Sequence, residues 1–494
     1  MRWNGRLVLL LVVFSMVTSS MFTLTVVRGS LREPAPSGAI AALGDAFLPG
    51  SGQNQYPKEF AKLHDAYNVI KNQYVQDVPV EQLVEGAIEG MIEALEDPYS
   101  AYMDPKSAGE YNSALQSSFQ GIGAEVTMKN GRVTIVSPYK DSPAEKAGLR
   151  PNDQVISVNG ESLEGLSLHE AVEKIRGPKG TKVTLEVIRE GVAQPLTIVV
   201  IRDEIPLETV YSERITSGSS TFGQIQIAQF STETAARFQE EVNRLEQEGI
   251  DGLIIDVRGN PGGYLKAVVD ISKALLPDKK PIVTIEYGKG SASQGETYYA
   301  AAAEAKPYPI VVLTDNGSAS ASEILAAAMR ESGGYKLVGE KTFGKGTVQS
   351  TVQMKDDSLI KLTIAKWLTP NGKWINNQGI EPDIVVRQPA YFHAARLPDN
   401  KTLSFDMADP DVKNLQLILQ GLGHDPGRQD GYFDKRTEEA VKRFQAEQRL
   451  AVTGRVDQAT VEALHTALLE KIRDPQNDLQ LQKAIEVLKQ QNTQ

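Results

Sequence analysis

Between residues 204 and 388 the sequence alternates strand-like apolar runs with amphipathic helical segments. The runs GLIIDVRG and PIVVLTD read as buried strands, and YLKAVVDISKALL and SEILAAAMRES read as the helices that follow them. Strands that alternate with helices favour a sheet covered on its faces by the connecting helices. This segment is therefore predicted to form an α/β body around a buried sheet.

The chain has 494 residues, too many for one hydrophobic core, and several further units are predicted. Residues 117–203 read as a compact β-rich unit with a hairpin turn at Asn130-Gly131. Residues 56–116 begin with two amphipathic helical segments, for which packing on a neighbour is a sufficient role. The predicted fold class is multidomain α/β, with an N-terminal helical segment, a β-rich domain, an α/β body and a small all-α C-terminal domain.

A short repeat marks the C-terminal part of the chain. The segment GYFDKRTEEA recurs 23 residues later as GRVDQATVEA, and both copies are followed by helical sequence. Asp434 and Asp457 stand where a helix N-cap is expected. Residues 404–470 are therefore predicted to form a small domain of about three helices, and residues 471–494 a further amphipathic helix.

An uncharged apolar run from residue 7 to 27 follows two arginines at the N-terminus. About 21 helical residues span ~31 Å, which is enough to cross a bilayer, and the basic flank favours a cytoplasmic N-terminus. Residues 1–28 are predicted to be a transmembrane signal anchor, and residues 29–55, rich in Gly, Pro, Ser and Ala, a linker. The alternative is a cleaved signal peptide and a secreted protein.

Composition excludes several kinds of chemistry. The net charge of −11 gives no support for a nucleic-acid partner. The absence of cysteine excludes disulfides, cysteine nucleophiles and thiolate metal sites. No histidine lies between residues 170 and 392, so the α/β body cannot contain a Ser-His-Asp triad, and there is no HExxH metal motif. We expect neither a metal nor a cofactor.

The segment DNGSASASEI forms a predicted corner between a buried strand and a helix. It carries Ser318, Ser320 and Ser322 at the point where N–H groups of the helix N-terminus can hold an anion. This is the arrangement of a nucleophile elbow. The alternative is that the three serines only cap the helix and fill small spaces.

A serine nucleophile without histidine needs another base, and a lysine serves near neutral pH if its pKa is lowered. Lys345 lies between two glycines in GEKTFGKGTVQ, and the period of a strand places Gln349 on the same face, where it can orient the amine. The segment also begins like a nucleotide-binding P-loop. However, Gly346 stands where that motif requires Ser or Thr.

Two glycine-rich turns are candidate binding elements. An oxyanion hole needs two N–H donors, which Ala321 and the Gly262-Gly263 turn can supply, although an ordinary tight turn would look the same. In the β-rich unit, the turn Gly121-Ile122-Gly123 can capture a terminal carboxylate while the peptide adds as an extra strand.

Together these segments resemble the carboxy-terminal processing peptidases, a family of Ser-Lys serine proteases. Seven runs carry the resemblance, in the family's order: DPYSAYMDP, FQGIGAEV, SPAEKAGLRPNDQVISVNG, IRGPKGTKVTLEVIR, LIIDVRGNPGG, GSASASEI and GEKTFGKGTVQ. The resemblance implies that Ser320 is the nucleophile, Lys345 its base and Gln349 the residue that orients the lysine. It also implies a PDZ domain at 117–203, ahead of a protease domain at 204–388.

The resemblance further implies an endopeptidase that cleaves proteins near their C-termini, with the PDZ domain reading apolar tails and gating the active site. Arg176, in IRGPKG, is a candidate link between tail binding and gating. The repeat region at 404–470 resembles a peptidoglycan-binding domain, which suggests a site between cell membrane and wall. The helices at 56–96 and the C-terminal helix are candidates for a homodimer contact. The rival functions are a non-catalytic PDZ scaffold tethered to the wall and a murein hydrolase, although no carboxylate pair marks the latter.

Overall fold

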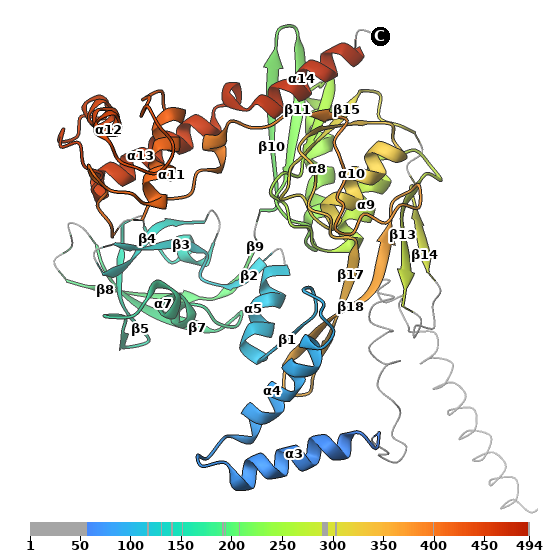
Figure 1. Ribbon diagram of the computed structural model, residues 1–494, viewed down its shortest axis with the longest axis vertical. Helices are drawn as coiled ribbons and strands as arrows, with labels where there is room; N and C mark the ends of the chain where they lie inside the picture. Colours follow the sequence, from blue (N-terminus) through green and yellow to red (C-terminus); the bar gives the residue numbers. More distant parts are fainter. Residues whose placement is uncertain are drawn as a thin grey trace, which may run out of the picture. The chain divides into compact units, whose positions relative to one another are not determined.

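The computed structural model describes residues 57–492 except for 116–117, 130, 140–141, 151, 190–191, 193, 207, 289–294, 302–303 and 399 (Figure 1). The chain divides into two compact units. One holds the described residues up to Asp104 with Ser350–Leu362, and the other holds Pro105–Gln349 and Thr363–Gln494. The predicted anchor and linker lie outside the described residues. Within the described part, no helix has the length and apolar character that a membrane span requires.

The smaller unit contains the two predicted helices, α3 (Phe60–Gln73) and α4 (Val80–Glu93). A short strand, β1 (Ala101–Met103), pairs antiparallel with the start of β18 (Leu359–Leu368). Neither helix buries any of its residues, although both carry apolar side chains at helical spacing. Helix α4 lies against β1, so part of the expected packing on a neighbour is present, but it buries no residue of the pair fully within the described part of the unit.

The β-rich domain forms an antiparallel sheet in the order β3-β4-β5-β7-β8. Its elements are α5 (Pro105–Leu115), β2 (Ser118–Gly121), β3 (Ala124–Lys129), β4 (Arg132–Pro138), α6 (Pro143–Lys146), β5 (Gln154–Val158), β6 (Glu161–Ser162), α7 (Leu168–Ile175), β7 (Lys182–Ile188), β8 (Leu196–Ile201) and β9 (Asp203–Pro206). Lys129 pairs with Arg132 across the turn, which confirms the predicted hairpin. Strand β3 is at the edge of the sheet, and β2 pairs separately with β9.

The protease-like body is built on a six-stranded sheet in the order β10-β11-β12-β15-β16-β19, parallel from β11 to β19. Its elements are β10 (Val210–Ser217), β11 (Ser220–Ile227), α8 (Thr234–Gln247), β12 (Gly252–Asp256), α9 (Leu265–Leu275), β15 (Ile310–Thr314), α10 (Ala321–Glu331), β16 (Lys336–Gly339), β19 (Ile384–Val385) and α14 (Leu479–Asn492). The predicted α/β alternation is confirmed.

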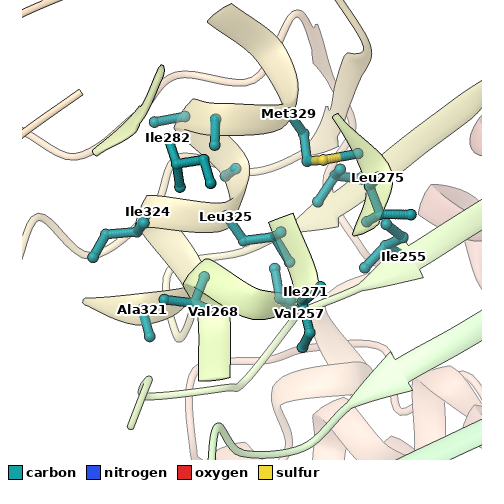
Figure 2. Packing of buried hydrophobic residues seen from close by; sticks show 14 of the residues in the cluster. Ile255, Val257, Val268, Ile271, Leu275, Ile282, Ala321, Ile324, Leu325 and Met329 are labelled. Carbon is teal, nitrogen blue, oxygen red and sulfur yellow. The ribbon is translucent and has the colours of Figure 1, made fainter. Parts of the chain in front are cut away.

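Both faces of this sheet are buried, which explains the unbroken apolar runs of its strands. On β12, Leu253 and Ile255 pack into the cluster formed with α8, α9 and α10. Figure 2 shows Ile255 near Leu275 of α9 and Leu325 and Met329 of α10. Ile254, which lies between Leu253 and Ile255 in β12, belongs to a second cluster on the opposite face, where α14 packs.

A second sheet in this unit is formed by β13 (Pro281–Tyr287) and β14 (Glu296–Tyr299) with the end of β18. Strand β17 (Thr347–Gln353) leads away from the segment that contains Lys345. Trp367, near the end of β18, is buried in the main core. It thereby joins the second sheet to the body.

The C-terminal domain contains the three predicted helices, α11 (Pro410–Gly421), α12 (Lys435–Glu447) and α13 (Gln458–Arg473), after a short 3-10 helix η1 (Ala390–His393). The two predicted N-caps are confirmed. A carboxylate oxygen of Asp434 accepts the Thr437 N–H at 2.9 Å, and one of Asp457 accepts the Thr460 N–H at 3.0 Å.

The C-terminal tail differs from the predicted division at residue 471. Helix α13 continues to Arg473, and the 3-10 helix η2 (Pro475–Asn477) connects it to α14. The amphipathic helix α14 is present as expected, but its apolar side covers the sheet of the protease-like body. The last segment of the chain is therefore a structural part of that body.

Candidate active site

Ser320 lies at a corner between β15 and α10 and has an unusual backbone conformation. Its φ is 53° and its ψ is −109°. For a residue other than glycine, such a conformation costs about 1–3 kcal/mol and persists only where the surroundings impose it. The surroundings are tightly packed, because α10 is buried from Ala321 to Met329.

The three serines of this corner have different environments. Ser318 is fully buried and donates its hydroxyl to the Val257 carbonyl at 2.8 Å. Ser322 is also fully buried and donates to the Asn260 carbonyl at 2.8 Å. Ser320 is only partly buried. The first two serines therefore join the corner to the loop that contains Val257 and Asn260, and Ser320 is the accessible serine of the three.

The Gly262-Gly263 turn lies directly against this corner. A Cβ atom on Gly262 would lie 2.9 Å from the Cβ of Ser320 and 3.0 Å from the nitrogen of Ala321. A Cβ atom on Gly263 would lie 1.9 Å from the Phe230 carbonyl oxygen. Both positions therefore require glycine, and the structure brings together Ser320, Ala321 and the turn predicted to form the oxyanion hole.

The N–H groups of the turn have different partners. The Gly262 N–H donates to Oδ1 of Asn260 at 2.8 Å. Among the described residues, no acceptor is found for the N–H of Gly263. The N–H of Ala321 belongs to the first turn of α10, whose N–H groups have no partner within the helix. The donors available at this corner are therefore those of Ala321 and Gly263.

The backbone around Lys345 is fixed from several sides. The Trp367 indole donates to the Lys345 carbonyl at 2.8 Å, and the Trp374 indole donates to the Gly346 carbonyl at 2.8 Å. A Cβ atom on Gly344 would lie 2.8 Å from the nitrogen of Gly379. Lys345 itself is partly buried. The flanking glycines let other backbone segments approach closely enough to hold it.

The buried carboxylate of Glu323 joins the two predicted dyad segments. Glu323 is fully buried and accepts the N–H of Ser320 at 2.9 Å, of Lys345 at 2.8 Å and of Gly344 at 2.7 Å. It also accepts the Thr342 hydroxyl at 2.6 Å. No role was predicted for Glu323 from the sequence. Its signal was the spacing S-x-x-E at a helix start, in which the glutamate accepts the N–H of the capping residue.

Gln349 lies on β17, with its side chain held by two threonines. Its Nε2 donates to the Thr347 hydroxyl at 2.9 Å and to the Thr363 hydroxyl at 3.2 Å. The amide oxygen is the acceptor of this group and takes no part in these two bonds, so it can accept a hydrogen bond from a lysine amine.

In the β-rich domain, the predicted carboxylate-binding turn begins at Gly121, the last residue of β2. The carbonyls of Ile122 and Gly123 accept the N–H groups of Ala144 and Tyr139, at 2.7 and 2.9 Å. No acceptor is found among the described residues for the N–H groups of Ile122 and Gly123 themselves. These donors precede the edge strand β3, so the geometry suits a terminal carboxylate.

Arg176 follows α7 and lies over an aromatic ring beside this turn. Its guanidinium carbon is 4.9 Å from the centre of the Phe119 ring, a cation–π contact. Its Cγ lies 3.7 Å from the position that a Cβ on Gly121 would take. Elsewhere in the described part of the chain, no group of three or more acidic or histidine side chains is arranged to hold a metal ion.

Comparison with known sequences finds family matches for four segments of the chain. Residues 221–386 match peptidase family S41, and residues 134–189 match a PDZ domain. Residues 45–107 match the N-terminal domain of the activating protease CtpB, and residues 408–464 match a peptidoglycan binding domain.

Whole-chain relatives agree with these matches. The chain is 49% identical over 446 residues to the carboxy-terminal processing protease CtpB of Bacillus subtilis, covering 90% of this chain and 92% of that one. It is 43% identical over 433 residues to the carboxy-terminal processing protease CtpA of the same organism, covering 88% and 91%. A solved structure of a photosystem II D1 C-terminal processing protease matches at 26% identity, with a TM-score of 0.40, over 67% of this chain and 94% of that one. The chain therefore belongs to the carboxy-terminal processing serine proteases of peptidase family S41.

Proposed function

We propose that this protease uses Ser320 as nucleophile and Lys345 as general base, and that it cleaves extracytoplasmic proteins near their C-termini. The observation that carries the dyad is the carboxylate of Glu323, which accepts the backbone N–H of both residues. A shared buried acceptor fixes the two segments relative to each other. The strained backbone of Ser320 supports the same assignment, because such strain gathers at functional sites.

In the proposed reaction, the neutral Lys345 amine takes the hydroxyl proton as the Ser320 oxygen attacks the scissile carbonyl. The N–H groups of Ala321 and Gly263 hold the oxyanion of the tetrahedral intermediate. The protonated lysine then gives its proton to the departing amine. Water, with Lys345 again as base, hydrolyses the acyl-enzyme, and the Gln349 amide oxygen orients the lysine throughout.

The test is cleavage of an unstructured protein with an apolar C-terminal tail. We expect Ser320→Ala and Lys345→Ala to abolish cleavage while the fold persists. The matched control is Lys341→Ala, because Lys341 is exposed and makes a surface ion pair with Glu381 at 2.8 Å. Cleavage by Ser320→Ala at the wild-type rate would refute the site. A wild-type protein that binds the tail but never cleaves would favour the scaffold.

We propose that the PDZ domain reads the apolar tail through the N–H groups of Ile122 and Gly123, with the peptide added beside β3. Matched substrates with a free carboxylate, a C-terminal amide or a charged last residue test this recognition. We expect the amide and the charged tail to raise KM. Equal KM for all three substrates would contradict tail recognition, while leaving the dyad in place.

We propose that Arg176 links tail binding to activity through its contact with Phe119, two residues before Gly121. Arg176→Ala removes the cation–π contact, whereas Arg176→Lys keeps a cation over the ring. We expect Arg176→Ala to change the dependence of cleavage on the tail, and Arg176→Lys to change it less. Wild-type behaviour of Arg176→Ala would refute the link.

We place the enzyme in the cell envelope, anchored by residues 1–28 and bound to peptidoglycan through residues 404–470. The match of the C-terminal domain to a peptidoglycan binding domain supports this location. Protease added to intact cells should degrade the body of the protein, and purified cell wall should retain it. Protection of the body in intact cells would contradict this location.

We also propose a homodimer through the α3–α4 pair. Its apolar side chains include Phe60 and Leu63, which are 44% and 45% exposed. Sedimentation of the wild type and of Leu63→Glu tests this contact. A monomeric wild type would exclude it.

A further inference from the structure

The C-terminal helix α14 completes the core of the protease body. Its apolar residues Leu481, Ile485 and Leu488 are almost fully buried, and they form one cluster with the sheet residues Ile254 and Val311. In the sequence, this helix follows the domain of α11, α12 and α13, which we call the wall-binding domain. The core of the protease is therefore built from segments on both sides of that domain.

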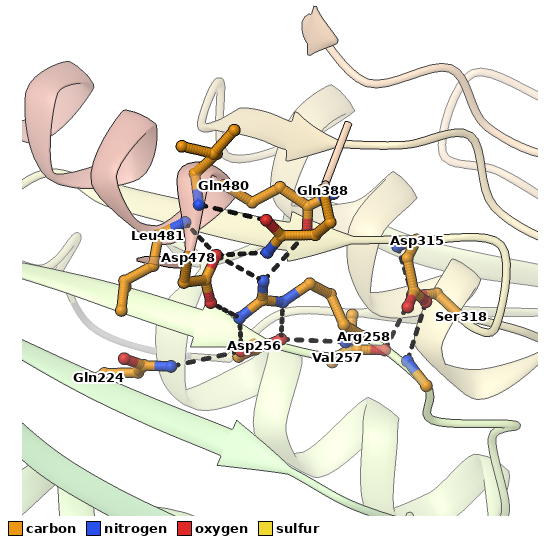
Figure 3. Close-up of polar contacts among 12 residues, drawn as sticks. Gln224, Asp256, Val257, Arg258, Asp315, Ser318, Gln388, Asp478, Gln480 and Leu481 are labelled. Atoms are coloured by element: carbon orange, nitrogen blue, oxygen red, sulfur yellow. Dashed lines mark hydrogen bonds and ion pairs between the residues drawn. The ribbon is translucent and has the colours of Figure 1, made fainter. Parts of the chain in front are cut away.

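Asp478, the residue just before α14, has two roles. One carboxylate oxygen, Oδ1, accepts the Leu481 N–H at 2.9 Å and thereby caps the helix. The carboxylate also accepts two hydrogen bonds from Arg258, from Nη1 at 3.0 Å and from Nη2 at 2.8 Å (Figure 3). The start of α14 is thus tied to an arginine 220 residues away in sequence.

Every N–H group of the Arg258 guanidinium has an acceptor. Asp256 takes Nε at 2.9 Å and one Nη2 proton at 2.6 Å. Asp478 takes the second Nη2 proton, and Nη1 is shared between Asp478 and the Gln480 side chain at 3.0 Å. Burial of the guanidinium alone would lower the pKa of Arg258, but Asp256 and Asp478 outweigh burial and raise it. The arginine side chain is only 15% exposed, so the loss of Asp478 would leave two of its N–H groups without this acceptor.

Arg258 belongs to the loop that carries the Gly262-Gly263 turn. The next residue, Gly259, donates its N–H to Oδ1 of Asp315 at 2.8 Å, and the Asn260 carbonyl accepts the Ala319 N–H at 3.0 Å. The loop is thus bonded to the serine corner on one side and to the α14 anchor on the other. We therefore expect a shift of Arg258 to displace the turn, whose Gly263 lies five residues later.

We propose that Asp478 is a positioning residue for the oxyanion hole, because through Arg258 it fixes the loop that presents the Gly263 N–H to the substrate. This inference rests on the proposed function, in which that N–H holds the oxyanion. It assigns a part in the reaction to the segment beyond the wall-binding domain. Since the oxyanion forms only in the reaction, a misplaced donor lowers kcat and leaves KM nearly unchanged.

The test is Asp478→Asn in the full-length enzyme. Asparagine is also a good N-cap, so the start of α14 is kept, but its amide group presents protons to Arg258 in place of the second carboxylate oxygen. We expect kcat to fall by about tenfold to a hundredfold, since a misplacement near 1 Å costs this much. The KM for a tail-bearing substrate should stay within about twofold, as expected for an interaction made only in the transition state.

The control is Leu488→Ala, which weakens the packing of α14 without touching Arg258. Both variants are assayed at a temperature where unfolding curves show them fully folded. A fall in kcat for Asp478→Asn alone supports the inference. A wild-type kcat for Asp478→Asn, or an equal fall for Leu488→Ala, overturns it. Cleavage that survives Ser320→Ala would instead show that the proposed function is wrong.

Discussion

The substitution that tests the site most sharply is Glu323→Gln, compared with Glu323→Ala. The carboxylate divides its four hydrogen bonds evenly. Oε1 accepts the Thr342 hydroxyl and the Gly344 N–H, and Oε2 accepts the N–H groups of Ser320 and Lys345. Glutamine keeps the shape but has an acceptor on one side only.

The expected loss of folding stability in each variant follows from this division of the hydrogen bonds. The Thr342 hydroxyl can accept a hydrogen bond from the glutamine amide, whereas a backbone N–H cannot. The amide nitrogen should therefore face Thr342 and Gly344, and the amide oxygen should keep Ser320 and Lys345. One unpaired buried N–H and weaker neutral hydrogen bonds cost about 2–4 kcal/mol. Alanine leaves all four donors unpaired, together with a cavity, and should cost at least about 5 kcal/mol.

The assay can observe this region directly. Trp367 and Trp374 donate to the carbonyls of Lys345 and Gly346, so tryptophan fluorescence during urea unfolding reports on the segment around Lys345. We expect Glu323→Gln to unfold at lower urea but to keep kcat within about tenfold, because its oxygen still holds both dyad segments. Glu323→Ala should lose more than about a hundredfold in kcat.

The control for the lost charge is Glu286→Gln, which removes an exposed ion pair with Lys366 and should change stability by less than about 1 kcal/mol. Wild-type stability and kcat in Glu323→Gln would refute the role of Glu323. Equal effects of Gln and Ala at this position would refute the argument that one side of the carboxylate matters more for activity.

Three further outcomes are expected. Gly262→Ala places a Cβ 2.9 Å from that of Ser320 and should lower kcat about a hundredfold; a wild-type rate in single-turnover cleavage would contradict the close approach. Burial raises the pKa of Asp478, but Arg258 outweighs burial and holds it below 3.8, so its ion pair stabilises the fold above that pH and is lost as the pH falls through the lowered pKa. The difference in urea midpoint between wild type and Asp478→Asn should therefore be full at neutral pH and shrink below pH 3.8, and a difference independent of pH would argue against the ion pair. Gln445→Leu removes the buried acceptor of the Gly454 N–H, at 2.9 Å, and should speed hydrogen exchange at that amide; unchanged exchange would show that the turn holds without it.

Features that depend on neighbouring residues could be predicted from the sequence. The hairpin between Lys129 and Arg132 follows from its turn residues, and the caps at Asp434 and Asp457 follow from one side chain and the third N–H after it. The alternation of strands and helices follows from the spacing of apolar residues. Each of these signals lies within one element or one turn.

Features that depend on distant segments could not be predicted in this way. The spacing of Ser320 and Glu323 is that of a capping glutamate, although no role was predicted for Glu323 from it, and it gives no sign of the N–H of Gly344, which comes from another segment 21 residues later. Periodicity showed an amphipathic α14 without showing which surface its apolar side covers. Nothing near Arg258 in the sequence indicates Asp478, because the contact exists only once α14 lies on the sheet.

The path of the chain changes how the wall-binding domain should be regarded. The chain leaves the protease body after β19, forms the helical domain and returns to the body at α14. The domain is therefore an insertion between two parts of the protease rather than an appendage at its end. Its last helix ends at Arg473. Asp478, the hydrogen-bond partner of Arg258, follows only five residues later, after η2. Because the connection is this short, the contact between Arg258 and Asp478 lies next to the point at which the wall-binding domain rejoins the enzyme.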